Sequence, residues 1–119
     1  MAYPHSTYTT SRSLKYSYIR IPPRFPNTQS ILFLHGFPST SHGWRHQISF
    51  FKEKGYGILA PDLLGFGETS KPRELHMYRG KGMAQDIVEI MDFEGVGVVV
   101  GVAHDWYVSC PSLCLSLSW

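Results

Sequence analysis

The sequence is short of cysteine, of long apolar runs and of concentrated charge, and each shortage excludes a class of protein. Its two cysteines, Cys110 and Cys114, form one C-x-x-x-C pair, which is neither a disulfide framework nor a zinc site. No apolar stretch approaches membrane-spanning length, and residues 1–20 are polar where a secretory signal would need an apolar segment. We therefore expect a cytoplasmic chain with reduced thiols and no membrane partner.

The charges are balanced along the chain, which argues against a nucleic-acid partner. The 119 residues include 11 Lys or Arg and 9 Asp or Glu, and the basic residues are interspersed with the acidic ones. A protein that grips phosphates usually concentrates its positive charge in runs or stripes. A chain of this length forms one domain at most and buries a modest core.

Two patterns that could bind a cofactor or a metal are incomplete. Gly65 and Gly67 follow a predicted strand, but a dinucleotide-binding loop needs a third glycine where this chain has Ser70. His42 and His46 share a helix face but lack the Glu of the H-E-x-x-H motif. We expect no cofactor and no metal.

The hydrophobic pattern predicts an α/β fold. Short apolar or alternating runs predict strands, and apolar residues at helical spacing predict helices. The predicted strands are residues 14–21 (half-exposed), 30–34, 57–60 and 95–103, and the predicted helices are 41–54 and 81–93. This order predicts a mostly parallel sheet with helices on its faces.

Three loops that follow predicted strands carry recognisable motifs. They read HGFP from His35, PDLLGFGETSKP from Pro61, and HDW from His104. Ligands bind beyond the carboxyl ends of strands in sheets of this kind. In this order and spacing, the motifs resemble those of epoxide hydrolases, which are α/β-hydrolases with a carboxylate nucleophile. The resemblance covers residues 16–106.

The resemblance implies a small-molecule epoxide as substrate and a diol as product. Asp105 occupies the position of the nucleophile, whose carboxylate attacks a carbon and forms an ester. The backbone N–H groups of Phe37 and Trp106 would form the oxyanion hole when water later attacks that ester. The alternative for Asp105 is a purely structural role as a helix N-cap after a strand.

The remaining motif residues are expected to support the loops. Gly36 allows the backbone to approach the site without a Cβ clash, and Pro38 fixes the turn. His35 and His104 are expected to be structural rather than catalytic. The alternative is that HGFP is only a turn that ends a strand.

The sequence departs from the family pattern around the nucleophile. The small glycines expected two residues on either side of Asp105 are Ala103 and the bulky Tyr107. The expected organisation is a disordered N-terminus over residues 1–13, a partial α/β-hydrolase core over 14–106, and a tail unrelated to the family over 107–119. The cap domain and the C-terminal half are absent from this expected fold.

Truncation at this point affects the expected chemistry. Similar enzymes use a late His and a second acid to activate water, and two cap tyrosines to protonate the epoxide oxygen. Because no residue here matches these groups, we expect the chain not to turn over.

Other functions stay open beside the epoxide hydrolase. Haloalkane dehalogenases usually have Asn where this chain has Phe37, and haloacid dehalogenases commonly have Arg where it has Trp106, so both residues favour epoxides. A non-catalytic remnant is a third possibility. Serine hydrolases are disfavoured because the chain contains no G-x-S-x-G.

The tail yields a prediction about the gene. Trp106-Tyr107-Val108 is encoded by TGG-TAY-GTN, which contains GTAYGT, a string similar to the start of a spliceosomal intron. We expect sequencing of the transcript to reveal a splice junction that restores Gly after Trp106. An uninterrupted message through Trp119 would contradict this hypothesis.

Overall fold

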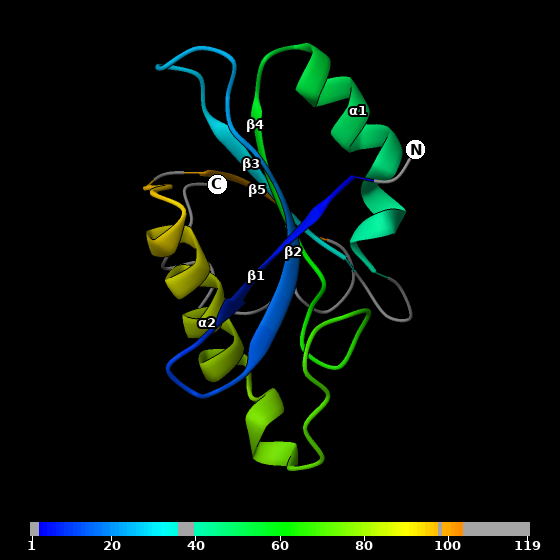
Figure 1. Cartoon of the computed structure of the whole chain (residues 1–119), viewed down its shortest axis with the longest axis vertical. Coiled ribbons are helices and arrows are strands. Elements are labelled where there is room, and N and C mark those ends of the chain that lie inside the picture. Colours follow the sequence, from blue (N-terminus) through cyan, green and yellow to red (C-terminus); the bar gives the residue numbers. More distant parts are fainter. Residues whose placement is uncertain (1–2, 36–39, 98, 104–119) are drawn as a thin grey trace.

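A five-stranded mixed sheet forms the centre of the computed structural model, which describes residues 3–35, 40–97 and 99–103 (Figure 1). Its strands are β1 (His5–Thr9), β2 (Lys15–Ile21), β3 (Ser30–Leu34), β4 (Gly57–Pro61) and β5 (Val99–Ala103), in the order β1-β2-β4-β3-β5. β4, β3 and β5 are parallel to one another, whereas β1 and β2 are antiparallel to their neighbours. The predicted α/β architecture is confirmed, with an antiparallel pair added at one edge.

Two helices cover the sheet. A 3-10 turn, η1 (Ser41–Trp44), leads into α1 (Arg45–Glu53), and η2 (Leu75–Tyr78) precedes α2 (Gly80–Phe93). α1 and α2 lie on opposite sides of the sheet (Figure 1). Within the described residues, neither helix is long and apolar enough to cross a bilayer. The helices predicted at 41–54 and 81–93 are therefore confirmed, except that the first begins as a 3-10 turn.

Each face of the sheet has its own apolar core, because successive side chains of a strand point to opposite faces. In β3, Ile31 and Phe33 join the cluster that contains Ile48 of α1. Leu32 and Leu34 join the cluster that contains five apolar residues of α2. All five residues of β3 are buried, as a strand covered on both faces requires.

The N-terminal residues differ from the expected disorder. His5–Thr9 forms β1 and pairs with β2 in a register that places Tyr8 opposite Tyr16. Tyr8 also packs on Phe93, with ring centroids 4.8 Å apart. Ser, Thr and Tyr are compatible with a strand. Because these polar residues bury little apolar surface, the strand is stabilised by its pairing with β2. β2 is consequently an interior strand, and Tyr16 is 1% exposed where the pattern predicted a half-exposed strand.

A buried ion pair connects the β1–β2 turn to α2. Asp86 is fully buried, and Arg12 donates to it through Nε at 3.0 Å and through Nη2. The Tyr16 hydroxyl donates to the same carboxylate at 2.7 Å. The hydrogen bond to Asp86 raises the pKa of Arg12, although burial of the guanidinium opposes that rise. Two donors thus offset the cost of burying the Asp86 charge.

Removal of the tyrosine hydroxyl tests this cluster. We expect Tyr16→Phe to lower the free energy of unfolding by about 1.5–3 kcal/mol, the usual loss for a hydrogen bond to a charged group. Tyr56→Phe is the matched control, because Tyr56 is 37% exposed and should change stability by less than about 0.5 kcal/mol. Urea unfolding at neutral pH measures both, and equal values for the two variants would contradict the role of the hydroxyl.

Candidate active site

The parallel strands end at one edge of the sheet, where the predicted site lies. Leu34 and Ala103 are register partners at the ends of β3 and β5, so the chain leaves these strands at neighbouring positions. The predicted nucleophile Asp105 is two residues beyond Ala103. Asp105 lies outside the described residues, as do the other predicted site residues Gly36, Phe37, Pro38, His104 and Trp106. Their roles stay predictions, and the strands that lead to them are described.

His35, the first residue beyond β3, is 2% exposed. Its Nε2 accepts a hydrogen bond of 2.9 Å from the backbone N–H of Leu63. The Phe66 ring packs against the imidazole edge to face, with centroids 5.3 Å apart. An Nε2 that accepts this bond carries no proton, so it cannot donate there. These contacts support a role in holding the loop, which stays the prediction for His35.

Asp62, the first residue beyond β4, is a buried acid whose partners sequence reasoning missed. It is 3% exposed, and its Oδ1 accepts from the Ser41 backbone N–H at 2.9 Å and from the Ser41 hydroxyl at 2.7 Å. Its own carbonyl accepts from the Thr69 hydroxyl at 2.6 Å. A possible signal was the position of Asp62 directly after a buried strand, because a carboxylate there must find donors. The sequence does not reveal that Ser41 supplies them.

The loop after β4 fastens both ends of the segment that contains HGFP. Leu63 bonds to His35, the first residue of HGFP, and Asp62 bonds to Ser41, which lies beyond Pro38. Two consecutive residues of one loop therefore hold the two points between which residues 36–40 run.

The glycines of this loop serve its geometry. Gly67 has φ +55°, and a Cβ at this position would lie 2.3 Å from Oδ2 of Asp62. The absence of a side chain thus allows the chain to curl over the buried carboxylate, while the Glu68 N–H approaches Oδ2 at 3.4 Å. This close approach explains Gly67 without any role in nucleotide binding.

A serine, a histidine and an aspartate also meet near this edge, but not as a catalytic relay. Nδ1 of His5 lies 2.8 Å from the Ser17 hydroxyl and 3.9 Å from Oδ2 of Asp62. A relay needs the base and the orienting acid on opposite ring nitrogens, whereas here one nitrogen faces both groups. Among the described residues, no three His, Cys, Asp or Glu side chains are grouped as metal ligands would be.

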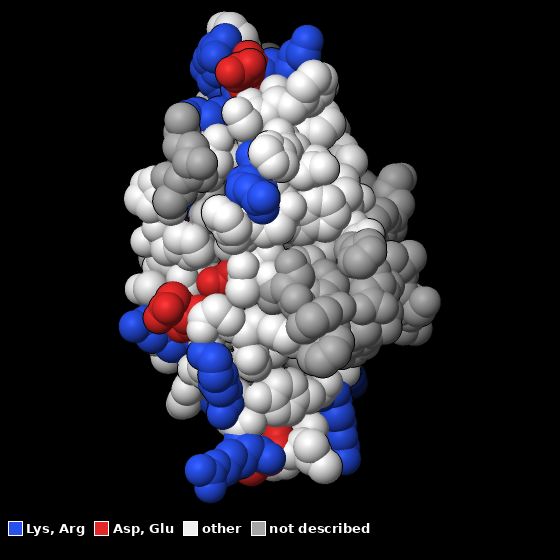
Figure 2. All heavy atoms as spheres, turned by 90° about the vertical axis from the view of Figure 1, so that its right-hand side faces the viewer, with Lys and Arg blue, Asp and Glu red and all other residues white. Residues whose placement is uncertain are grey.

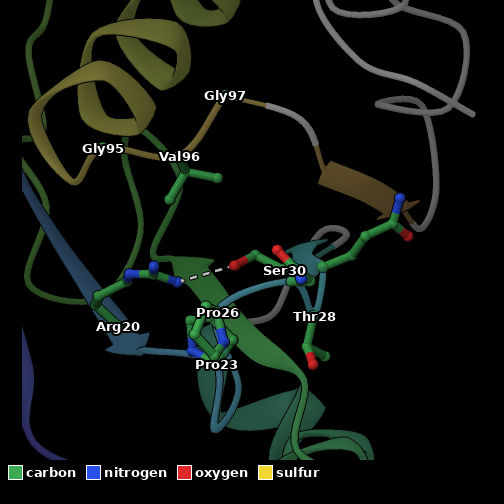
Figure 3. A pocket seen from close by; sticks show the side chains of 10 residues that line it. Arg20, Pro23, Pro26, Thr28, Ser30, Gly95, Val96 and Gly97 are labelled. Carbon is green, nitrogen blue, oxygen red and sulfur yellow. Dashed lines mark hydrogen bonds between the residues drawn. The ribbon is translucent and has the colours of Figure 1, made fainter.

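A cavity of about 270 Å³ lies at the other edge of the sheet, between residues 22–30 and Gly95–Gly97 (Figure 3). Arg20 in its wall donates to Ser30 Oγ at 3.3 Å and lies 3.8 Å from the Glu94 carboxylate. Burial lowers the pKa of Arg20, and Glu94 opposes that shift. Because Glu94 and the C-terminal end of α2 offset the cation, the cavity gives little attraction to an anion. The carboxyl edge therefore remains the candidate site.

Residues 29–106 match the family model described as the alpha/beta hydrolase fold. Epoxide hydrolase 2 of Siraitia grosvenorii is 43% identical over 77 residues, which are 65% of this chain and 24% of the relative. Epoxide hydrolase A of Mycobacterium tuberculosis is 37% identical over 81 residues, 68% of this chain and 25% of the relative. This chain thus spans about a quarter of the length of these curated relatives.

Solved structures agree with the sequence relatives. The crystal structure of an epoxide hydrolase from Vigna radiata has a TM-score of 0.82 at 37% identity, covering 94% of this chain and 35% of that one. An epoxide hydrolase from hot-environment metagenomes has a TM-score of 0.81 at 30% identity, covering 90% of this chain and 35% of that one. In both cases the similarity extends over nine-tenths or more of this chain.

The close approach of Gly67 to Asp62 can be tested with alanine. We expect Gly67→Ala to destabilise the fold by about 2–4 kcal/mol, the sum of a left-handed backbone penalty and a clash with a carboxylate. Gly97→Ala is the control, since a Cβ there meets nothing within 4 Å and should change stability by less than about 0.5 kcal/mol. Urea unfolding compares the two, and a Gly67→Ala variant as stable as Gly97→Ala would contradict the geometry.

Proposed function

Since the chain belongs to the α/β-hydrolase fold family, we propose that its activity is the opening of small-molecule epoxides with Asp105 as the nucleophile. Relatives that share 77 and 81 aligned residues with it are named epoxide hydrolases. The family alone would not select this chemistry, because the fold hosts many reactions. An aspartate at the nucleophile position selects attack on carbon rather than acyl transfer from a serine.

The proposal rests on the parallel pairing of β3 with β5. Leu34 and Ala103 end these strands side by side, and the residues that follow them are the HGFP and HDW motifs. A backbone N–H from each motif, at Phe37 and at Trp106, would then face the same point near Asp105. An oxyanion hole requires this convergence of two donors on one reacting oxygen.

The proposed reaction has two steps, of which we expect this chain to carry out the first, because no residue here matches the late His and second acid that activate water for the second in similar enzymes. A carboxylate oxygen of Asp105 attacks an epoxide carbon, the C–O bond of the ring breaks, and the ring oxygen takes a proton from solvent water to become a hydroxyl. Water then attacks the ester carbonyl, the N–H groups of Phe37 and Trp106 stabilise the negative oxygen, and collapse releases the diol and restores the carboxylate. No cofactor enters either step.

The hydrogen bonds of the β4 loop support the second step. Donors stabilise a developing charge best when they are held in place before the reaction. His35 and Ser41 flank the segment with Phe37, and both are fixed to the β4 loop. Gly36 and Pro38 would shape the backbone between these anchors, and His104 would support Asp105 from the β5 side.

Intact-mass spectrometry tests the nucleophile directly. We expect the chain of 119 residues, incubated with styrene oxide, to gain the mass of one epoxide on Asp105 through an ester that hydroxylamine removes. The ester should persist, because no residue of this sequence matches the late His and second acid that activate water in similar enzymes.

Two variants make the mass measurement specific. Asp105→Asn should abolish labelling, whereas Asp92→Asn should leave it unchanged, because Asp92 is an exposed acid on α2. Labelling that survives Asp105→Asn would refute the proposal. A parallel sample with a primary alkyl chloride tests the dehalogenase alternative. That alternative predicts that the alkyl group becomes attached to Asp105 and that chloride ion is released.

A further inference from the structure

Exposed aromatic rings and cations gather at the end of the molecule away from the candidate site. α1 ends there, and the β2–β3 loop lies beside it at the top of Figure 1. We call this surface the basic–aromatic end. It consists of Arg24, Phe25, Phe50, Lys52, Lys54 and Tyr56.

Contacts join the two segments of the basic–aromatic end into one surface. The Arg24 backbone N–H donates to the Gly55 carbonyl at 2.9 Å. A Cβ at Gly55 would lie 3.6 Å from the Phe25 ring, so the loop lies directly against the α1–β4 turn. The Phe51 ring contacts those of Phe50 and Tyr56, with centroids 5.1 and 5.8 Å away.

The aromatic rings of this surface are unusually accessible. Phe25 is 58% exposed, Phe50 is 55% exposed and Tyr56 is 37% exposed. A single exposed apolar residue needs no explanation, but several that adjoin one another indicate an interaction surface. Phe25 and Phe50 could each bury more than half of their accessible surface against a partner.

The charge of the same surface is positive. Arg24, Lys52 and Lys54 are exposed, and Glu53 is the only acidic residue in segments 22–29 and 50–57. Figure 2 shows Lys and Arg side chains at this end with acidic surface between them, and further Lys and Arg side chains at the opposite end. Lys54 Nζ lies 5.3 Å from the centre of the Phe50 ring, so cation and ring are presented together.

We propose that the basic–aromatic end docks onto an anionic lipid surface. Phenyl and phenol rings insert at the boundary between headgroups and acyl chains, and lysine and arginine attract anionic headgroups. Single-stranded nucleic acid, which also combines cations with rings, needs an open ring face for each base. Lys54 sits over Phe50, and Phe51 packs on Phe50 and Tyr56, so these rings are less suited to stack bases.

Docking in this way leaves the candidate site accessible. The basic–aromatic end lies at the amino ends of β3 and β4, whereas the predicted nucleophile follows the carboxyl end of β5. The carboxyl edge would therefore face away from the bilayer. The proposal revises the expectation of no membrane partner, which rested on the lack of a spanning segment and not on the surface.

Vesicle co-sedimentation tests the proposal with the full chain. We expect binding to vesicles of phosphatidylcholine and phosphatidylserine in equal amounts, and little binding to phosphatidylcholine alone. Each cation near an anionic surface contributes about fivefold in affinity, so Lys52→Gln with Lys54→Gln should weaken binding about 25-fold. Arg73→Gln with Lys81→Gln removes the same charge from exposed positions near the other end and should change binding much less.

A second variant examines the rings at unchanged charge. Phe25→Ser with Phe50→Ser alters only exposed side chains and should weaken binding roughly tenfold. Equal binding to both vesicle types, or equal losses in the two charge variants, would overturn the proposal. The proposal would also be overturned if the chain did not bind vesicles but self-associated, or bound a single-stranded oligonucleotide, in a way that depends on Phe25 and Phe50.

Discussion

The carboxylate of Asp62 is almost completely removed from water, and its hydrogen bonds in the described structure come from a backbone N–H and a hydroxyl of Ser41 and from the Glu68 N–H. A buried charge that is solvated by such dipoles requires each donor in a fixed place, because an unsatisfied carboxylate costs several kcal/mol. The donors come from the start of η1 and from the β4 loop. The start of η1 and the β4 loop are therefore held in one arrangement by one carboxylate.

This constraint also explains the composition of the β4 loop. Gly67 must lack a side chain because the loop passes directly over the carboxylate. Thr69 accepts from the Ser17 N–H and donates to the Asp62 carbonyl, which connects the loop to β2. Local geometry thus accounts for Gly67 and Thr69, and Gly67 needs no ligand to explain it.

Much of the fold could be predicted from the sequence. The apolar runs 30–34 and 57–60 and the helical spacing of apolar residues in 81–93 mark the residues that are buried. β1 did not follow, since its Ser, Thr and Tyr residues form a strand only when β2 is beside them. The partners of Asp62 were also missed, because they come from residue 41 and from beyond the glycines. Asp105, Phe37 and Trp106 were proposed from motif order, a signal that depends on the family and not on packing.

The ion pair between Arg12 and Asp86 has a consequence for how the protein unfolds locally. A terminal strand usually frays first, because few contacts cross to the rest of the domain. Here the turn that follows β1 is anchored in α2, where Arg12 contacts Asp86 and Ser11 contacts Glu89. Release of β1 and β2 would expose an unpaired carboxylate within the α2 core. Amide hydrogens of β2 and α2 should therefore exchange together, as one cooperative unit.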